Sequence, residues 1–310
     1  MIVLDNIIFD LIKVGGVSKY WAETIERLDK TDLSIKFFEG SLVSNNFDRN
    51  KLSLKGEKIP DKGSIIKRRL IRPRIEAEIF HSSYYRVSSK AKYNIVTIHD
   101  FINEKYPSHP RDFVLSKIKK HACSVADHIV VVSECTKKDL LEHYPSIDPN
   151  TVSVIYNGVD DSFYPEICKA VFKTPKGIIE PNKYFLYVGS RGKCKNFNYV
   201  LSIFSKAQHR KKGIKLVIVG EKSLSNKECA AAKELGIDLN DITQIGYANH
   251  ALLRQLYSNS LGLLIPSLYE GFGIPALEAA RCGSLVIGAS GSALDEVIGD
   301  STYMINLTKK

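Results

Sequence analysis

Short apolar runs of strand length alternate with helical patterns along most of the chain. The clearest runs are residues 95–98, 128–132, 151–155, 184–188 and 215–220. Strands of this length separated by helices are typical of parallel sheets built from strand–helix–strand units. The pattern therefore predicts an α/β protein with doubly wound, Rossmann-like sheets.

The chain is long enough for two domains. Its 310 residues can bury two hydrophobic cores rather than one. Prolines and glycines break the periodicity between Pro165 and Lys183, as in a linker. We therefore expect a first domain over residues 1–165, a linker over 166–182 and a second domain over 183–310. Ligands of such sheets bind outside the carboxyl ends of the strands, so we expect a cleft between the two domains.

The most distinctive segment, residues 266–278, joins a predicted strand to a predicted helix and carries two carboxylates, Glu270 and Glu278. A helix that begins near Ile274 places Glu278 about one turn in, while Glu270 lies in the preceding loop. Both carboxylates could then reach one ligand. A solvated helix glutamate and a charge that complements the helix dipole are the alternative interpretation.

Backbone features of the same turn favour a phosphate ligand. Pro275 suits a first helical turn, where its missing N–H costs nothing. Gly271 and Gly273 let the backbone approach a ligand closely. Free amides at the start of a helix attract anions, so the turn predicts a phosphate-binding site.

A second loop supplies cations. Arg191, Lys193 and Lys195 lie within five positions after the predicted strand 184–188. Fixed cations stabilise the negative charge that develops on a leaving diphosphate, and they do so without a metal. We select Arg191 and Lys195 as candidate ligands and expect Lys193 to be solvated. The sequence shows no convincing Asp-x-Asp motif, so we expect no metal site.

Two features of the first half lie where a ligand could bind. Gly15 and Gly16 separate a strand-like opening from the helical run 19–28, although tight turns also use glycine pairs for purely structural reasons. His99 and Asp100 follow the strand 95–98 and so lie at its carboxyl end. A packed, hydrogen-bonded histidine is the alternative for His99.

Together these segments resemble the retaining glycosyltransferases of family 4, which have the two-domain GT-B fold. The longest match runs from Leu253 to Ser301 and includes Tyr257, the turn around Glu270 and Glu278, and Glu296. Shorter matches upstream are Gly15–Tyr20, Phe80–Ser82, Thr97–Asp100, Val131–Glu134, Asn157–Asp160 and Tyr187–Arg191. One departure stands out, because the family's arginine usually follows the glycine directly, whereas here Ser190 takes that position and Arg191 the next.

The resemblance implies a nucleoside diphosphate sugar as donor, GDP- or UDP-linked, with no further cofactor. It implies that His99 and Glu270 act at the donor sugar and that Glu278 accepts from the ribose hydroxyls. Further implied binding residues are Gly15, Gly16, Arg191, Lys195, Gly271, Phe272 and Gly273 around the phosphates, and Gly246 and Tyr247, after the expected strand 242–245, at the base.

The implied reaction moves mannose or another hexose to a glycan or lipid-linked acceptor of surface polysaccharide, such as lipopolysaccharide, with retention of configuration. Three alternatives stay open: a GT-B nucleotide-sugar epimerase, a DNA-glycosylating enzyme, and a non-catalytic or truncated scaffold. The family also has helices after the expected strand 301–305, and this chain stops at Lys310. Without those helices we expect looser domain closure and weaker activity.

The net charge of +10 is unevenly distributed. Nine basic residues cluster in two segments: Lys62, Lys67, Arg68, Arg69, Arg72, Arg74, Lys117, Lys119 and Lys120. Apolar residues, Ile65, Ile66, Leu70 and Ile71, interleave with the first group, as in segments that lie on acidic membranes. A solvated helix with its apolar positions in the core fits equally well. Because no aromatic residues interleave with the charges, we expect no nucleic-acid binding.

The remaining composition is that of a soluble enzyme. Six scattered cysteines without CxxC spacing indicate reduced packing residues. No apolar run approaches the roughly 20 residues of a membrane span, and the first residues lack the pattern of a signal peptide. We therefore expect a cytoplasmic protein that works at the inner face of the membrane.

Overall fold

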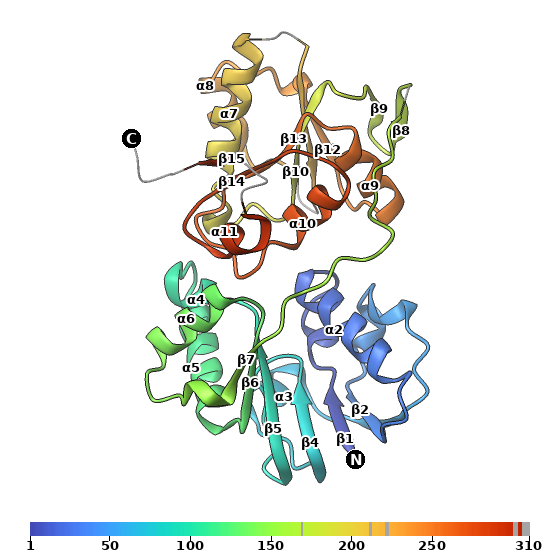
Figure 1. Cartoon of the computed structure of the whole chain (residues 1–310), viewed down its shortest axis with the longest axis vertical. Coiled ribbons are helices and arrows are strands. Elements are labelled where there is room, and N and C mark those ends of the chain that lie inside the picture. Colours follow the sequence, from blue (N-terminus) through green and yellow to red (C-terminus); the bar gives the residue numbers. More distant parts are fainter. Residues whose placement is uncertain (169, 211–212, 221–222, 300–302, 306–310) are drawn as a thin grey trace. The chain divides into compact units, whose positions relative to one another are not determined.

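The computed structural model describes residues 1–168, 170–210, 213–220, 223–299 and 303–305. The chain divides into two compact units, Met1–Asn157 and Gly158–Lys310, and each is built around its own parallel sheet (Figure 1). The predicted α/β class with doubly wound sheets is confirmed.

The division between the units lies earlier in the chain than the expected boundary at residue 165. The expected linker, 166–182, belongs to the second unit and contains the antiparallel hairpin of β8 (Phe172–Thr174) and β9 (Gly177–Ile179). Phe172 and Ile179 are buried in the core of the second unit. The lack of periodicity thus reflects a short hairpin packed on that core.

The first unit contains seven strands: β1 (Ile2–Asp5), β2 (Ile35–Glu39), β3 (Glu57–Pro60), β4 (Ala77–Ser82), β5 (Ala91–Ile98), β6 (His128–Val131) and β7 (Val152–Val154). Its helices are α1 (Ile8–Leu11), α2 (Gly16–Leu28), α3 (Ile65–Leu70), α4 (Ile102–Lys105), α5 (Pro110–Val125) and α6 (Glu134–His143), with 3₁₀ turns at Val43–Asn45, Arg49–Lys51 and Pro149–Thr151. The strand order is β3-β2-β1-β4-β5-β6-β7. All neighbours are parallel.

In the second unit the remaining strands are β10 (Tyr184–Val188), β11 (Lys215–Val219), β12 (Ile242–Ile245), β13 (Gly262–Ile265), β14 (Val286–Ala289) and β15 (Tyr303–Ile305). The helices are α7 (Phe197–Arg210), α8 (Asn226–Glu234), α9 (His250–Ser258), α10 (Ile274–Arg281) and α11 (Ala293–Ile298), with 3₁₀ turns at Lys193–Lys195 and Leu239–Asp241. The parallel sheet has the order β12-β11-β10-β13-β14-β15.

Both sheets are buried on two faces, because successive side chains of a strand point to opposite sides. In β10, Tyr184 and Leu186 enter a cluster with residues of α9, α10 and α11. Tyr187, on the other face, packs with residues of α7 and α8. In the first unit, Leu4 packs with residues of α1 and α2 while Val3 packs on the opposite side.

Each sheet reverses its strand order once, and this reversal determines where candidate site residues lie. The reversal lies between β1 and β4 in the first unit and between β10 and β13 in the second. Loops that leave two neighbouring strands in opposite directions open a crevice at their carboxyl ends. Candidate site residues are therefore expected in the loops after these strands.

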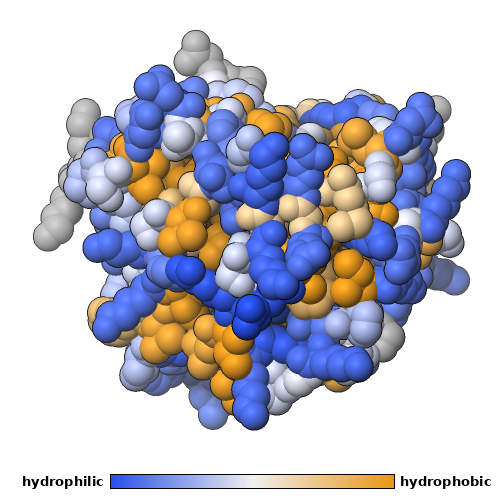
Figure 2. Space-filling model, turned by 90° about the horizontal axis from the view of Figure 1, so that it is seen from below, coloured by the Kyte–Doolittle hydropathy of each residue, from blue (hydrophilic) through white to orange (hydrophobic). Residues whose placement is uncertain are grey.

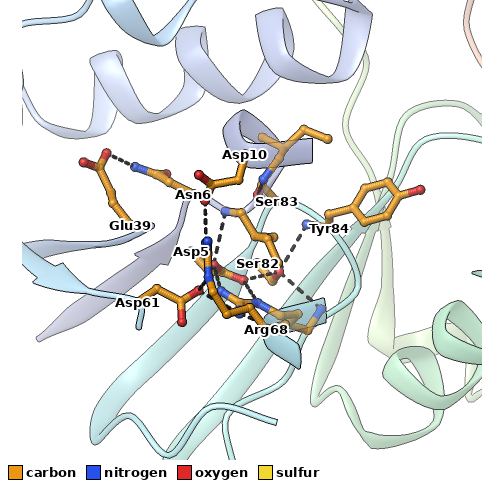
Figure 3. A network of polar contacts seen from close by, with 12 residues as sticks. Asp5, Asn6, Asp10, Glu39, Asp61, Arg68, Ser82, Ser83 and Tyr84 are labelled. Atoms are coloured by element: carbon orange, nitrogen blue, oxygen red, sulfur yellow. Dashed lines mark hydrogen bonds and ion pairs between the residues drawn. The ribbon is translucent and has the colours of Figure 1, made fainter. Parts of the chain in front are cut away.

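In the first unit a buried network of charges, which includes Asp5, Asp61 and Arg68, occupies this position (Figure 3). Arg86 donates from Nε to Asp5 at the end of β1, at 2.8 Å, and from Nη1 to Asp61, at 2.9 Å. Asp61 also lies 2.7 Å from Nε of Arg68, which in turn pairs with Asp10. Burial alone lowers the pKa of Arg86, but the two carboxylates raise it above its ordinary value. The guanidinium therefore stays charged.

Two basic residues that were expected on the surface are buried. Arg68, expected on a basic surface, is only 5% exposed, and Lys119 is completely buried. Lys119 donates from Nζ to Glu104 and to the Asp100 carbonyl, both at 2.8 Å. Buried cations need such partners, because an unpaired charge in the interior is very costly. The prediction of a surface role was wrong for these two residues.

We expect Arg86→Met to destabilise the first unit by about 3–5 kcal/mol, because it leaves Asp5 and Asp61 buried without their shared cation. The measurement is urea denaturation followed by circular dichroism. Lys36→Met is the matched control, since its partner Glu57 is exposed and such a pair contributes at most about 1 kcal/mol. Equal losses of unfolding free energy in the two variants would show that the buried network contributes no more to stability than an exposed ion pair.

Candidate functional site

The centre of the candidate site is an ion pair between the loops that follow β10 and β13. Lys195 donates from Nζ to both carboxylate oxygens of Glu270, each at 2.7 Å. Ser267 donates from Oγ to Oε1 of the same carboxylate, at 2.6 Å. Glu270 is buried, while the Lys195 side chain is 24% exposed. A buried anion thus faces a cation that solvent, and hence a ligand, can reach.

Backbone contacts hold these two loops together. The Leu268 amide donates to the carbonyl of Cys194, at 2.7 Å, and the Ala293 amide donates to that of Glu270, at 3.3 Å. The loop after β13 is therefore fixed on one side to the Lys193–Lys195 turn and on the other to α11. Because the ion pair stands on a rigid frame, its geometry is defined before any ligand binds.

The start of α10 depends on glycine at position 273. Gly273 has a φ of +92°, which is costly for residues with a Cβ atom. A Cβ there would also lie 2.4 Å from Cδ2 of Leu294. Pro275 follows in the first turn, as predicted. The structure thus confirms a helix that begins at Ile274, with Gly271 and Phe272 buried in the turn before it.

Glu278 lies one turn into α10 and is held by Tyr257 of α9. The Tyr257 hydroxyl donates to Oε2 of Glu278 at 3.1 Å, and both side chains are buried. Burial, and then the neighbouring carboxylate, raise the pKa of Tyr257 well above its ordinary value, so it remains a donor. No role for Tyr257 could be predicted from the sequence, because only the fold brings α9 and α10 together.

Arg191 has a different environment from the one expected. Its Nε lies 2.8 Å from Oε1 of Glu228 and its Nη2 donates to the Ser223 carbonyl, at 2.8 Å. These contacts tie the loop after β10 to α8. Lys193 is exposed, as predicted. Lys195, from the same loop, pairs with the site carboxylate.

Gly246 and Tyr247 directly follow β12. The Gly246 carbonyl accepts from the Gly220 amide at 3.1 Å, which joins the loops after β12 and β11. Tyr247 is 48% exposed. Both residues thus lie at the carboxyl edge of the second sheet, where the sequence analysis placed them.

In the first unit, Gly15 and Gly16 form the start of α2. Gly15 is its N-cap residue, and its carbonyl accepts from Oγ of Ser18, at 3.0 Å. The Ser18 hydroxyl shares its single proton between this carbonyl and Oδ2 of Asp48, which lies 2.5 Å away. The glycine pair therefore stands in a strand-to-helix turn that a side chain of the helix stabilises.

His99 follows β5, and its loop is held from behind. The ring packs edge-on against Tyr20, with centroids 4.9 Å apart, and Lys119 anchors the next carbonyl, that of Asp100. Burial lowers the pKa of His99 to about 4, with Asp100 raising it and Lys119 lowering it. At neutral pH the imidazole is uncharged, so one ring nitrogen can donate and the other accept.

Two kinds of site are absent from the residues that the structure describes. Among the described residues, no group of three or more His, Cys, Asp or Glu side chains is arranged to hold a metal ion. None of the helices in the described part of the chain has the length and apolar character needed to cross a bilayer.

Two family models match the chain, one over each half. Glycosyltransferase Family 4 matches residues 14–163, and Glycosyl transferases group 1 matches residues 169–305. The chain is 24% identical to O-antigen chain mannosyltransferase B of Escherichia coli, over 92% of this chain and 81% of that protein. Other relatives are matched over about half of their length, for example 44% and 49%.

Solved structures share the fold. WaaG, a glycosyltransferase involved in lipopolysaccharide biosynthesis, superposes with a TM-score of 0.68 at 15% identity, over 97% of this chain and 84% of that one. Anabaena HepE in complex with UDP and glucose gives 0.68 at 13% identity, over 98% and 85%. At such identities the likeness shows the fold, which is GT-B as expected.

The low pKa of His99 gives a pH prediction. A second histidine, His81, bonds to Thr97 and also has its pKa lowered to about 4, first by burial and then by His99. We expect the ring resonances of both histidines to stay constant in NMR spectra between pH 8 and pH 5, with His81→Gln and His99→Gln used for assignment.

Stability should follow the same shift. Between the ordinary histidine pKa of about 6.5 and the folded value, the unfolded chain binds protons that the folded chain does not, so stability falls as the pH decreases. The decrease in melting temperature from pH 6.5 to 4.5 should be smaller in either variant than in the wild type. Ring resonances with midpoints near 6.5 would contradict both expectations.

Proposed function

Since the chain belongs to the glycosyltransferases, with a Family 4 half followed by a group 1 half, we propose that it is a retaining, metal-independent hexosyltransferase. Its donor is a nucleoside diphosphate sugar, GDP- or UDP-linked, and mannose is the sugar we favour. Its acceptor is a glycan or a lipid-linked glycan of surface polysaccharide. The mannosyltransferase name of the E. coli relative supports this choice of sugar.

One observation carries the proposal: Lys195, Glu270 and Ser267 meet at the strand-order reversal of the second sheet. Lys195 offers a positive charge to a diphosphate, and the amides at the start of α10, around Phe272 and Gly273, offer hydrogen-bond donors to its oxygens. Glu270 offers acceptors to hydroxyl groups of the sugar. A cation, backbone amides and a carboxylate in one place match the parts of a nucleotide sugar.

Glu278 extends this arrangement toward the ribose. A buried carboxylate can accept from two neighbouring hydroxyls, and charge-assisted bonds of this kind are stronger than neutral ones. Tyr257 occupies Oε2 on one side and so fixes the orientation of the group. We propose that Glu278 binds the ribose hydroxyls, that Tyr257 is its positioning residue, and that Gly246 and Tyr247 contact the base.

In the proposed reaction the bond between the anomeric carbon and the diphosphate oxygen breaks. A new bond forms from that carbon to the acceptor oxygen on the same face of the sugar. The acceptor proton passes to the leaving phosphate, and the bonding electrons leave with the diphosphate. Lys195 and the helix amides stabilise the charge that develops there, the contribution expected to dominate the barrier.

Residues of the first unit complete the proposal. His99, neutral at physiological pH, is proposed to contact the sugar near the reacting carbon, and Gly15 and Gly16 to offer backbone atoms to the phosphates. Arg191 can serve the phosphates only if it releases Glu228, so we propose Lys195 as the main cation. We further propose that the protein is cytoplasmic and works at the acidic inner face of a membrane.

The test is isothermal titration of GDP, UDP, ADP and dTDP, without metal, against the wild type and Glu278→Ala. We expect selective binding of one nucleotide and a loss of affinity on the order of tenfold or more in the variant, because charge-assisted hydrogen bonds contribute about 1.5–3 kcal/mol. Tyr257→Phe should give a smaller loss. With the matching sugar donor, NMR of the product should show the anomeric configuration of the donor.

Glu234→Ala serves as control, since this glutamate is exposed on α8 and should not change binding. If none of the four nucleotides binds, the proposal of an active transferase fails and a non-catalytic protein becomes the better explanation. A product with the opposite anomeric configuration would be consistent with a glycosyltransferase but would contradict the retaining mechanism.

A further inference from the structure

We propose that a hollow between α3 and α5 in the first unit is a docking site for an acidic membrane surface. The hollow has a volume of about 270 Å³ and is lined by apolar residues, among them Leu70, Ile71 and Val114, together with the cations Arg69, Arg72 and Lys117. This hollow gives the proposed membrane contact a defined location. Its test measures membrane binding without glycosyl transfer, so the result is independent of the proposed transferase activity.

The apolar side chains of this hollow are strongly exposed. Leu70 is 60% exposed, Ile71 63% and Val114 50%, and Ile66 and Phe113 nearby are exposed to a similar degree. From the sequence, the apolar positions 66, 70 and 71 could lie either in the core or on the surface, and in the structure all three are exposed. Exposed apolar groups gathered in one place mark interaction sites. Figure 2 shows hydrophobic patches of this kind lying between hydrophilic side chains on one face of the molecule.

The buried network explains why these residues point outward. Arg68 of α3 turns inward to Asp10 and Asp61, and Arg86 donates to the Arg68 carbonyl at 2.9 Å. The last turn of α3 is thereby anchored to the carboxyl end of the sheet. With Arg68 fixed inside, its neighbours Leu70 and Ile71 remain on the surface.

The charges around the hollow are of one sign. Between Asp61 and Glu76 the chain has no acidic residue, and there is none between Asp112 and Asp127. In the part of the chain that the structure describes, no carboxylate lies within 4.0 Å of Arg69, Arg72 or Lys117. Within the same described residues, the buried Nε of Arg69 has no hydrogen-bond partner.

Arg72, two residues after the end of α3, reaches α5, where its Nε contacts Nε2 of His121 at 3.0 Å. Burial, and then the nearby guanidinium, lower the pKa of His121. A cation thus lies across the hollow beside exposed aliphatic groups. Lipid acyl chains match the aliphatic groups and lipid phosphates match the cations, whereas a soluble anion would contact the cations alone.

The experiment measures co-sedimentation of the whole protein with vesicles of phosphatidylcholine alone, or mixed with phosphatidylglycerol. We expect binding to the acidic vesicles only. Each cation near such a surface contributes about 1 kcal/mol, so Arg72→Gln with Lys117→Gln should weaken partitioning roughly 30-fold. Leu70→Asn with Val114→Asn should weaken it at high salt as well, because the apolar contribution is not screened.

The control is Lys55→Gln, which removes an exposed cation of the same unit that does not line the hollow. Thermal melting verifies that the variants fold. The proposal is overturned by equal binding to neutral vesicles, by no binding to acidic ones, or by equal losses in the control. It is also overturned if inorganic phosphate at matched ionic strength displaces the vesicles, since the site would then serve a free anion.

A second inference concerns the ion pair of the second unit and rests on the proposed function. We infer that the pair between Lys195 and Glu270 opens when the diphosphate binds. The phosphates compete with Glu270 for the same ammonium group. Once Lys195 turns to them, Glu270 keeps the Ser267 hydrogen bond and gains free acceptor capacity for the sugar hydroxyls. Recognition of the diphosphate would then prepare recognition of the sugar.

This exchange makes an unusual prediction for Glu270→Gln. The amide keeps the size of the side chain but no longer attracts Lys195 as an ion, so the nucleoside diphosphate should bind more tightly, on the order of tenfold for one charge-assisted hydrogen bond. The nucleotide sugar should gain less, because its sugar loses the carboxylate. Titration of both ligands measures the difference.

The variant Lys195→Met tests whether the tighter diphosphate binding of Glu270→Gln depends on Lys195. In that background Glu270→Gln should give no tightening, and Ser267→Ala alone should not tighten binding either. If Glu270→Gln weakens the diphosphate or leaves its affinity unchanged, the exchange is wrong. If the wild type binds no nucleoside diphosphate at all, the proposed function itself has failed.

Discussion

The reversal of strand order in each parallel sheet is the constraint on which the rest of this structure depends. Where the order reverses, the loops after two adjacent strands diverge, and polar groups can fill the crevice at their carboxyl ends. In the second unit this brings Lys195 to Glu270, and in the first it brings Asp5 to Ser82 and Arg86. Segments far apart in the chain thereby form two polar centres.

The two centres use the same position for different purposes. In the first unit the crevice is filled by Arg68 and Arg86 with three aspartates, and the side chains are almost completely buried. A buried network of this kind is costly to disturb and defines a unique packing. In the second unit the Lys195 side chain remains partly open to solvent, so its charge is available for exchange. The first centre stabilises the unit, and the second is suited to binding.

In α3, the buried cation Arg68 also determines which neighbouring residues lie on the surface. The anchoring of Arg68 sets the orientation of the six-residue helix α3, and this orientation decides which of its residues form the surface. Lys119 is a second buried cation that positions a neighbouring segment. Its hydrogen bond to the Asp100 carbonyl holds the loop that carries His99. Buried charges thus position both a surface and a candidate catalytic loop.

The sequence alone predicted the strands that stand out as short apolar runs, such as those over 95–98, 184–188 and 215–219, the helix that begins at Ile274 and the placement of candidate residues at the carboxyl ends of strands. These features follow from local rules: short apolar runs alternate with helical patterns, and Pro275 suits a first helical turn. Only the tertiary structure decided which cations are buried, that Arg191 pairs with Glu228, that Tyr257 holds Glu278, and that residues 166–182 pack on the second core. A side chain's partner can lie dozens of residues away, as Asp10 does from Arg68, and no local spacing encodes a contact that exists only after the sheets have formed.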